Sequence, residues 1–214
     1  MDKTVLSKQI VLTFGVFLAL ASVVFIAVNK GDFVLMFAEW HTPLLDKIFA
    51  YTTKLGEELG LIPALAFLMW RLPLSWKEKG AVLLKILICL LGMFGLVVVL
   101  KQYVFDLDRP VAYFEEMGVN LAQVEGVRLN RHHSFPSGHT ATAFFGWYLV
   151  FNLLLPLSKW RNIWFLIALS VGASRIYLGQ HFLQDVWAGS LIGYAWAFLA
   201  LQWIFNKHKS LLKA

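Results

Sequence analysis

The sequence is poor in charged residues and has a single cysteine. Only 15% of its 214 residues are Asp, Glu, Lys or Arg, against about 25% in typical soluble domains. Cys89 stands alone, so an intrachain disulfide and a cysteine-based metal cage are both excluded. The chain has no internal repeat and no low-complexity segment. With 59% hydrophobic residues, it is neither disordered nor fibrous, and we expect one domain, residues 1–214, whose outer solvent is lipid.

Long apolar runs take the place of the missing charge. A membrane-spanning helix needs about 20 mainly apolar residues. Six segments predict such helices: 10–28, 55–72, 81–105, 137–155, 162–178 and 184–205. Between the first two, residues 32–49 repeat apolar side chains at helical spacing among Glu39, Asp46 and Lys47. That pattern predicts an interfacial amphipathic helix broken near Pro43, acting either in packing or in substrate binding.

The predicted fold class is therefore all-α integral membrane, with six transmembrane helices in one bundle plus the interfacial helix. Gly189 and Gly193 lie four residues apart on the sixth helix, which favours close packing against a neighbour. An even number of crossings places both termini on one side. Lys and Arg favour that side once the cations of the candidate site are set aside, so we expect cytoplasmic termini and an outward-facing loop over residues 106–135.

The net charge of +6 has three interpretations. In a soluble protein it would suggest nucleic acid as a partner, but the apolar composition excludes a nucleic-acid-binding module with solvated faces. In a membrane protein, basic residues on the cytoplasmic side meet anionic lipid. Some of them can also bind an anionic substrate.

Polar residues at membrane depth are costly and usually mark function. Three clusters of them stand out, and alternation of helix direction places all three at the same outward face. The first ends the third helix, the second opens the fourth, and the third spans the end of the fifth helix and the start of the sixth. The clusters are Lys101 with Arg109-Pro110, then Pro136-Ser137-Gly138-His139, then Ser174-Arg175 with His181 and Asp185.

These residue types together suit phosphoryl transfer. Arginine presents a planar fork that matches phosphate oxygens, and a helix start such as Ser137-Gly138 offers free backbone N–H groups to an anion. His139 in the first turn can donate a proton to a departing oxygen. His181 and Asp185 are four residues apart, so the carboxylate can hold one imidazole nitrogen and leave the other free to attack.

The three blocks resemble the type 2 phosphatidic acid phosphatase superfamily, which includes the vanadium haloperoxidases, and in particular its bacterial membrane lipid phosphatases. The family pattern is K-x6-R-P, then P-S-G-H, then S-R-x5-H-x3-D. The second and third blocks match exactly within residues 101–185. The resemblance implies a metal-independent hydrolase without a cofactor, in which His181 is the nucleophile, Asp185 orients it and His139 is the acid. It also implies that the phosphoryl oxygens are held by Lys101, Arg109, Ser137, Gly138 and Arg175.

The first block departs from the family pattern. Seven residues separate Lys101 from Arg109, and a strict spacing of six would put Gln102 at the lysine position. One residue on a regular helix is a rotation of about 100°. A bulge could absorb the extra residue and keep Lys101 on the phosphate, or Gln102 could replace it as a neutral donor. We favour Lys101, because a long flexible side chain tolerates a shift.

The predicted function is hydrolysis of the terminal phosphate of a membrane lipid. The resemblance implies phosphatidylglycerophosphate, undecaprenyl pyrophosphate, phosphatidic acid or a lipid A phosphate as substrate, in a bacterial inner membrane with the site facing the periplasm. A lipid phosphotransferase on the same scaffold and a non-catalytic anionic-lipid binding or transport protein are the alternatives. The basic loop 128–133 is either a selector for a second phosphate or an exposed loop. Asp106 and Asp108 are expected to be loop or ion-pair residues rather than metal ligands.

Overall fold

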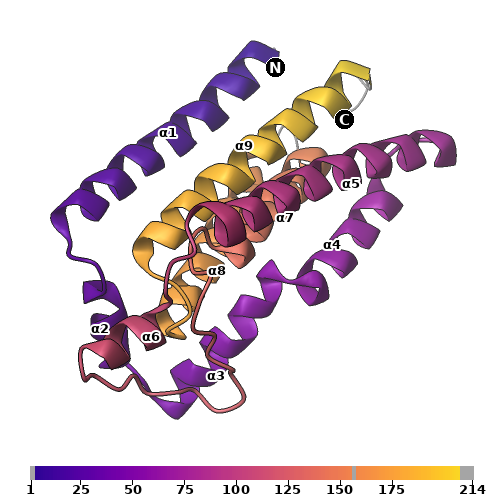
Figure 1. The fold of residues 1–214 in the computed structure, drawn as a ribbon. Helices are drawn as coiled ribbons and strands as arrows, with labels where there is room; N and C mark the ends of the chain where they lie inside the picture. Colours follow the sequence, from indigo (N-terminus) through magenta and orange to yellow (C-terminus); the bar gives the residue numbers. More distant parts are fainter. Residues whose placement is uncertain (1–2, 156–157, 208–214) are drawn as a thin grey trace.

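The computed structural model describes residues 3–155 and 158–207, and every regular element within these ranges is helical. The longer helices are α1 (Lys3–Ala27), α4 (Glu58–Arg71), α5 (Trp76–Val99), α7 (Gly138–Leu154), α8 (Ile163–Tyr177) and α9 (Leu183–Lys207). The shorter ones are α2 (Asp32–Ala38), α3 (Pro43–Thr52), α6 (Pro110–Glu116), η1 (Thr53–Gly56), η2 (Leu100–Val104) and η3 (Lys159–Asn162). Figure 1 shows the long helices side by side as a bundle.

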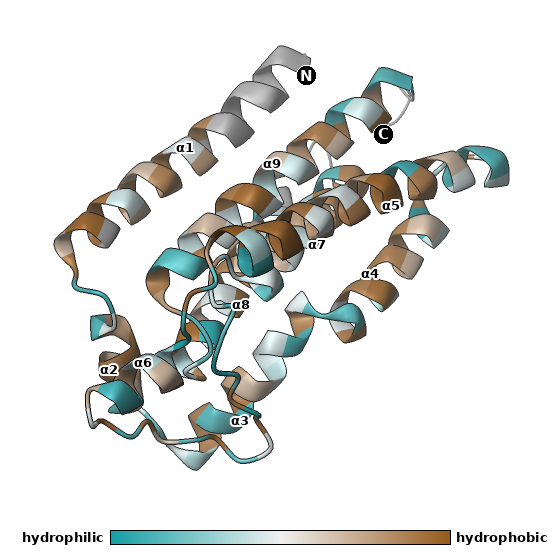
Figure 2. Ribbon diagram, viewed as in Figure 1, coloured by the Kyte–Doolittle hydropathy of each residue, from teal (hydrophilic) through white to brown (hydrophobic). Residues whose placement is uncertain are grey.

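All six apolar segments predicted from the sequence form helices. Within the described residues, two of these helices are long and apolar enough to cross a membrane: Trp76–Val104 and Leu183–Lys207. The apolar stretches Phe14–Val24 and Ile163–Tyr177 are shorter. Hydrophobic residues dominate the middle of α5, whereas hydrophilic residues gather toward its start (Figure 2). The helical class is confirmed, and the count of six membrane crossings stays a prediction.

The centre of the bundle is α7, which packs against α8, α9, α4 and α5. Its crossing with α9 is very close, because small residues face each other there. A Cβ added at Gly189 would lie 2.5 Å from the carbonyl oxygen of Ser137, and one at Gly193 would overlap the backbone of Ala141. The predicted close packing at these two glycines is therefore present, and it fixes the starts of α7 and α9 beside each other.

The predicted interfacial segment 32–49 is two helices, α2 and α3, with a break at residues 39–42. The break lies just before Pro43, as expected, and the Thr42 side chain caps α3 by accepting a hydrogen bond from the Leu45 amide. Both helices pack on the end of α8: Val34 of α2 lies in a cluster with Ile176, and Phe49 of α3 stacks on Tyr177. This segment has a packing role.

The segment 106–135, expected to be a loop throughout, contains one short helix. That helix, α6, begins at Pro110, a residue whose fixed φ suits the first helical position. Phe114 of α6 is buried against Val34, Ile176 and Phe182. Figure 1 shows α2, α3 and α6 together at one end of the bundle, with both ends of the described chain at the other.

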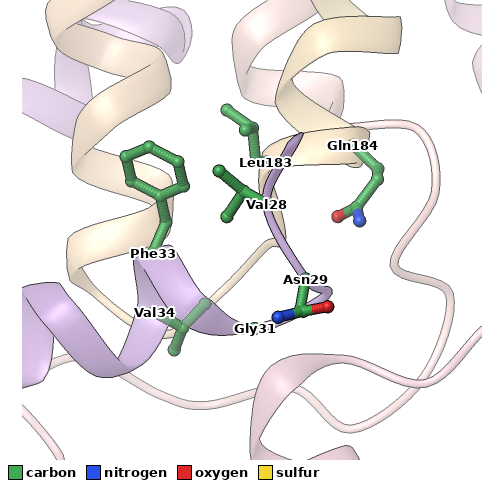
Figure 3. Close-up of a pocket in the computed structure, with 7 residues that line it drawn as sticks. All are labelled: Val28, Asn29, Gly31, Phe33, Val34, Leu183 and Gln184. Carbon is green, nitrogen blue, oxygen red and sulfur yellow. The ribbon is translucent and has the colours of Figure 1, made fainter. Parts of the chain in front are cut away.

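A small cavity lies where the α1–α2 connection meets the start of α9, lined by Val28, Asn29, Phe33, Leu183 and Gln184 among others (Figure 3). Its volume is about 10 Å³, which is close to the room needed by one water molecule. It is therefore too small to hold a substrate.

Candidate active site

The candidate site lies at the end of the bundle that carries α2, α3 and α6. The starts of α7 and α9 meet there, because the Ser137 amide donates to the carbonyl oxygen of Asp185 at 2.9 Å. The end of α8 reaches the same place, since the amides of Gln180 and His181 both donate to the carbonyl oxygen of Arg175. The structure thus brings the second and third sequence blocks together through their backbones.

His181 is held in one orientation by Asp185. The His181 side chain is 1% exposed, and its Nδ1 lies 3.2 Å from Asp185 Oδ2. The same Oδ2 accepts a hydrogen bond from the Phe182 amide at 2.9 Å and one from the Ser134 hydroxyl at 2.5 Å. A carboxylate oxygen so occupied by donors accepts from Nδ1–H, which leaves Nε2 as the imidazole nitrogen with a free lone pair.

The contact of Arg109 with the other ring nitrogen agrees with this assignment of the imidazole proton. Its Nη1 lies 3.4 Å from His181 Nε2. A guanidinium has no acceptor, so the contact requires Nε2 to be unprotonated. The same Nη1 also donates to the backbone and side-chain oxygens of Gln180, and Nε donates to the carbonyl oxygen of His132 at 2.9 Å. These contacts fix Arg109 beside the nitrogen predicted to attack phosphorus.

The surroundings keep the His181 imidazole neutral. Burial, followed by the positive charges of Arg109, Arg175 and Lys101, lowers the pKa of His181 well below its ordinary value of 6.5. Burial also lowers the pKa of Arg109, which Asp185 partly offsets. An arginine nevertheless stays charged at any physiological pH. The site therefore combines a neutral imidazole with a fixed cation beside it.

Lys101 lies in η2, and η2 is a π-helical turn. A π turn contains one more residue than an α turn, so it absorbs the extra residue between Lys101 and Arg109. Lys101 Nζ donates to the carbonyl oxygen of His133 at 3.0 Å and interacts electrostatically with Arg109, Asp185 and Arg175. Gln102 is exposed. The structure thus places Lys101, and not Gln102, beside the other cations.

The start of α7 presents its first turn to the same site. Ser137 caps the helix by accepting a hydrogen bond from the Thr140 amide, and its hydroxyl is fully buried. Gly138 follows as the first helical residue. Helix starts carry a partial positive charge and unpaired N–H groups. The predicted phosphate-binding role of Ser137 and Gly138 is therefore compatible with where they lie.

Arg175, near the end of α8, brings a third cation. Its Nη1 donates to the Thr53 hydroxyl at 2.8 Å, and its side chain is buried. Its Nε has no hydrogen-bond partner among the described residues. A buried donor without a partner is costly, and an anion in the site would satisfy it. This N–H group is therefore placed to donate to an anion.

His139 points toward a residue that the sequence blocks do not include. Its Nε2 lies 2.9 Å from Glu57 Oε1. Both residues line a polar cavity of about 300 Å³, together with Thr53, Lys54, Arg128, Asn130, Arg175 and Gln180 among others. The cavity lies next to the buried His181, because two residues of its lining, Arg175 and Gln180, also adjoin His181. The cavity is large enough for a phosphate group.

Two residues of the site, Ser134 and Glu57, were not found from the sequence. Ser134 comes two residues before Pro136, and only its 2.5 Å hydrogen bond to Asp185 shows its role. Glu57 lies more than 40 residues before the first block, beside another acidic residue, Glu58. Its position near the end of a predicted span was the one available signal.

The basic loop 128–133 is divided by its ion pairs. Arg131 pairs with Glu115, while His132 and His133 lie 2.7 and 3.0 Å from Asp108 and Asp106. The two aspartates are thus loop residues that each contact a histidine side chain. Arg128, in contrast, lines the polar cavity. In the part of the chain that the structure describes, no group of three or more His, Cys, Asp or Glu side chains is arranged to hold a metal ion.

Comparison with known proteins identifies similar sequences. Residues 81–209 match the PAP2 superfamily. Over 162 residues the chain is 32% identical to an undecaprenyl-diphosphatase of Sulfolobus acidocaldarius, covering 74% of this chain and 70% of that protein. A stretch of 61 residues is 43% identical to the bacitracin transport permease protein BcrC of Bacillus licheniformis. That stretch covers 28% of this chain and 29% of the permease.

Two solved structures share the architecture. The phosphatidylglycerolphosphate phosphatase of Bacillus subtilis, a transmembrane PAP2-type protein, aligns with a TM-score of 0.66 and 25% identity, covering 91% of this chain and 96% of that chain. Aquifex aeolicus LpxE aligns with a TM-score of 0.59 and 29% identity, covering 81% and 94%.

Proposed function

The chain belongs to the PAP2 superfamily and is a lipid phosphatase of that type. We propose that it hydrolyses the terminal phosphate of a membrane lipid phosphate through a phosphohistidine on His181. The observation that carries the proposal is the pair of contacts on the His181 ring. Asp185 holds Nδ1 at 3.2 Å, and Arg109 lies 3.4 Å from Nε2. One nitrogen is fixed as a donor, and the other keeps its lone pair beside a cation that attracts phosphate.

The reaction has two steps. In the first, the lone pair of His181 Nε2 forms a bond to phosphorus, the bond from phosphorus to the lipid oxygen breaks, and His139 gives a proton to that oxygen. In the second, His139 takes a proton from water, the water oxygen bonds to phosphorus, and the phosphorus–nitrogen bond breaks to release inorganic phosphate. Asp185 stabilises the positive charge that develops on His181 in the first step.

The cations supply most of the catalytic effect in such a transfer. Charge on the three equatorial oxygens of the phosphoryl group is stabilised by positioned donors rather than by covalent chemistry. Arg109, Arg175 and Lys101 surround His181 closely enough to act on its charge. The unpaired Nε of Arg175 supplies a donor ready for one phosphoryl oxygen.

We propose an isoprenoid diphosphate such as undecaprenyl diphosphate as the preferred substrate. The relative that matches most of this chain in sequence is named an undecaprenyl-diphosphatase. The polar cavity next to His139 carries Lys54 and Arg128, which can meet the second phosphate of a diphosphate. Phosphatidic acid and a lipid A phosphate lack this adjacent second phosphate, and in phosphatidylglycerophosphate a glycerol separates the two phosphate groups. All three lipids are expected to react more slowly.

For the membrane, we propose six crossings with cytoplasmic termini and the site facing outward across a bacterial inner membrane. The two ends of the described chain lie at the end of the bundle opposite the site (Figure 1), as an even number of crossings requires. The excess of Lys and Arg near the termini supports their cytoplasmic location.

The test is phosphate release by the detergent-purified protein from those four lipids, with EDTA present. We expect release from undecaprenyl diphosphate to be fastest, to survive EDTA, and to vanish in His181→Ala. The matched control is His132→Ala, which removes an exposed histidine paired with Asp108 and should retain activity.

Folding of each variant is checked by its elution volume in detergent and its helical circular dichroism signal. Equal activity of His181→Ala and the unchanged protein would reject the phosphohistidine. Loss of activity in EDTA that added divalent metal restores would reject the metal-independent mechanism. A faster rate on a monophosphate than on the diphosphate would reject the substrate preference alone.

A further inference from the structure

The turn that joins α3 to α4 contacts the site at several points, although none of the three sequence blocks includes it. This turn, Thr53–Glu57, comprises η1 and the residue that follows it. Thr53 accepts a hydrogen bond from Arg175, and the Leu55 carbonyl oxygen accepts one from the Trp147 indole at 2.8 Å. A Cβ added at Gly56 would lie 2.8 Å from the carbonyl oxygen of His139. The turn is therefore packed directly on α7 and α8 at the site.

Glu57 is the residue of this turn that reaches a reacting group. Its Oε1 lies 2.9 Å from His139 Nε2, and its Oε2 lies 3.2 Å from Lys54 Nζ. A carboxylate that lies between an imidazole and a lysine ammonium is placed to accept the Nε2–H proton of His139. No described residue hydrogen-bonds the other ring nitrogen, which leaves Nδ1 for the leaving oxygen.

Resting on the proposed phosphatase function, we propose that Glu57 is a positioning residue that orients His139 and stabilises its protonated form, so that His139 can act as the general acid. The charged groups around His139 make such a partner necessary. Arg175 and Arg109 both interact with His139, and each disfavours a positive charge there. In the part of the chain that the structure describes, Glu57 is the carboxylate hydrogen-bonded to His139. Glu125 and Arg128 share the cavity, and Lys54 reaches His139 only through Glu57.

Glu57 and Asp185 each hold a histidine of the site, but they have different effects on it. Asp185 fixes the tautomer of a histidine that must be neutral, whereas Glu57 favours the proton on a histidine that must carry one. In general, a carboxylate within hydrogen-bond distance raises the pKa of an imidazole by about one unit or more. Losing Glu57 should therefore affect proton delivery and leave formation of the phosphate-binding site intact.

The experiment compares Glu57→Gln, Glu57→Asp and the matched control Glu58→Gln, an exposed acidic neighbour. The measured quantity is the pH dependence of kcat/KM on undecaprenyl diphosphate. We expect Glu57→Gln to lower kcat about 10- to 100-fold and to change KM by less than about threefold. Its alkaline limb should lie at lower pH than that of the unchanged protein. Glu57→Asp keeps a carboxylate and should retain the unchanged protein's alkaline limb. Glu58→Gln should match the unchanged protein in both respects.

A double variant assigns the effect to His139. If Glu57 acts through His139, then Glu57→Gln adds no further loss in a protein that already carries His139→Ala. An unshifted alkaline limb in Glu57→Gln would overturn the inference, as would a multiplicative loss in the double variant or a faster Glu57→Gln enzyme. The unchanged protein is assayed in parallel, so failure of the phosphatase proposal itself appears separately as absent release or as activity that persists in His181→Ala.

Discussion

The two histidines of the site have opposite surroundings. The His181 side chain is 1% exposed and the Asp185 side chain that holds it 4% exposed, whereas those of His139 and Glu57 are 31% and 24% exposed. Donors converge on Asp185 from Ser134 and Phe182, but Glu57 shares its carboxylate with an exposed lysine. The proposed nucleophile, His181, is fixed in the buried interior, whereas the proposed acid, His139, lines a polar cavity.

This difference follows from what each histidine must meet. In the proposed mechanism, His181 reacts only with phosphorus, and a neutral buried ring surrounded by cations is ready to attack it. In the same mechanism, His139 meets a lipid oxygen in one step and water in the next, so it needs access to the cavity. Variants that alter the surroundings of only one histidine can therefore test this difference.

The largest effect is expected beside His181, from Asp185→Asn. An amide can donate to Nδ1 as well as accept from it, so the wrong tautomer of His181 becomes available. By analogy with an Asp that orients a catalytic His, kcat should fall about 10³- to 10⁴-fold. Stopped assays of phosphate release measure the loss, and acid-quenched samples show whether a phosphoenzyme still forms. A loss smaller than tenfold would mean that Asp185 is not the orienting group.

Removal of a phosphate-binding cation ranks next. Lys101→Ala should lower kcat/KM about 100-fold, the usual scale for one preorganised donor. Gln102→Ala should change it by less than about threefold, because Gln102 is exposed beside the π turn. Both are measured by phosphate release at fixed pH. The reverse ranking would assign the first sequence block to Gln102.

The pH profile distinguishes the two histidines directly. The pKa of His181 is well below 6.5, so its neutral form persists as the pH falls, and the acidic limb of kcat/KM should lie well below pH 6.5. After burial, the charge of Arg109 is the largest cause of this effect. Arg109→Gln should therefore move the acidic limb toward higher pH as well as slow the reaction, whereas Arg131→Gln should leave the limb in place. An acidic limb near pH 6.5 in the unchanged protein would contradict a lowered pKa of His181.

The smallest effect is expected at the mouth of the cavity. Arg128→Ala should slow undecaprenyl diphosphate hydrolysis about two- to fivefold, the scale of an exposed ion pair, with a smaller effect on phosphatidic acid. Arg131→Ala is the control, because that side chain pairs with Glu115 outside the cavity. Equal losses on both lipids would show that Arg128 does not contact a second phosphate.

Much of the fold could be predicted because apolar runs and helix periodicity are local signals. All six apolar segments are helices, and the break before Pro43 and the Gly189–Gly193 crossing follow from single residues with strong preferences. The helix α6 could not be predicted, because its seven residues are too few for a periodic pattern. Membrane crossing depends on contact with lipid. Within the described residues, length and composition are sufficient for a crossing in two helices.

The sequence blocks pointed to the site cations and histidines because each block is a short stretch of the chain whose residue types are chemically specific. The partners of those histidines were harder to find. Asp185 lies one helical turn from His181 and was predicted from spacing. Glu57 reaches His139 across 82 positions in the sequence, and Ser134 reaches Asp185 across 51. Such contacts depend on how helices pack, and a single sequence carries no spacing rule for them.

The π turn at Leu100–Val104 separates two quantities that motif searches treat as one, the count of residues and the reach of a side chain. A wider turn lengthens the chain between Lys101 and Arg109 without moving either cation out of the site. Motifs defined by a fixed gap would discard this chain at its first block, whereas a pattern that allows one inserted residue at a helix end would keep it. Deleting one residue from this turn should therefore be tolerated better than deleting one from the α-helix before it.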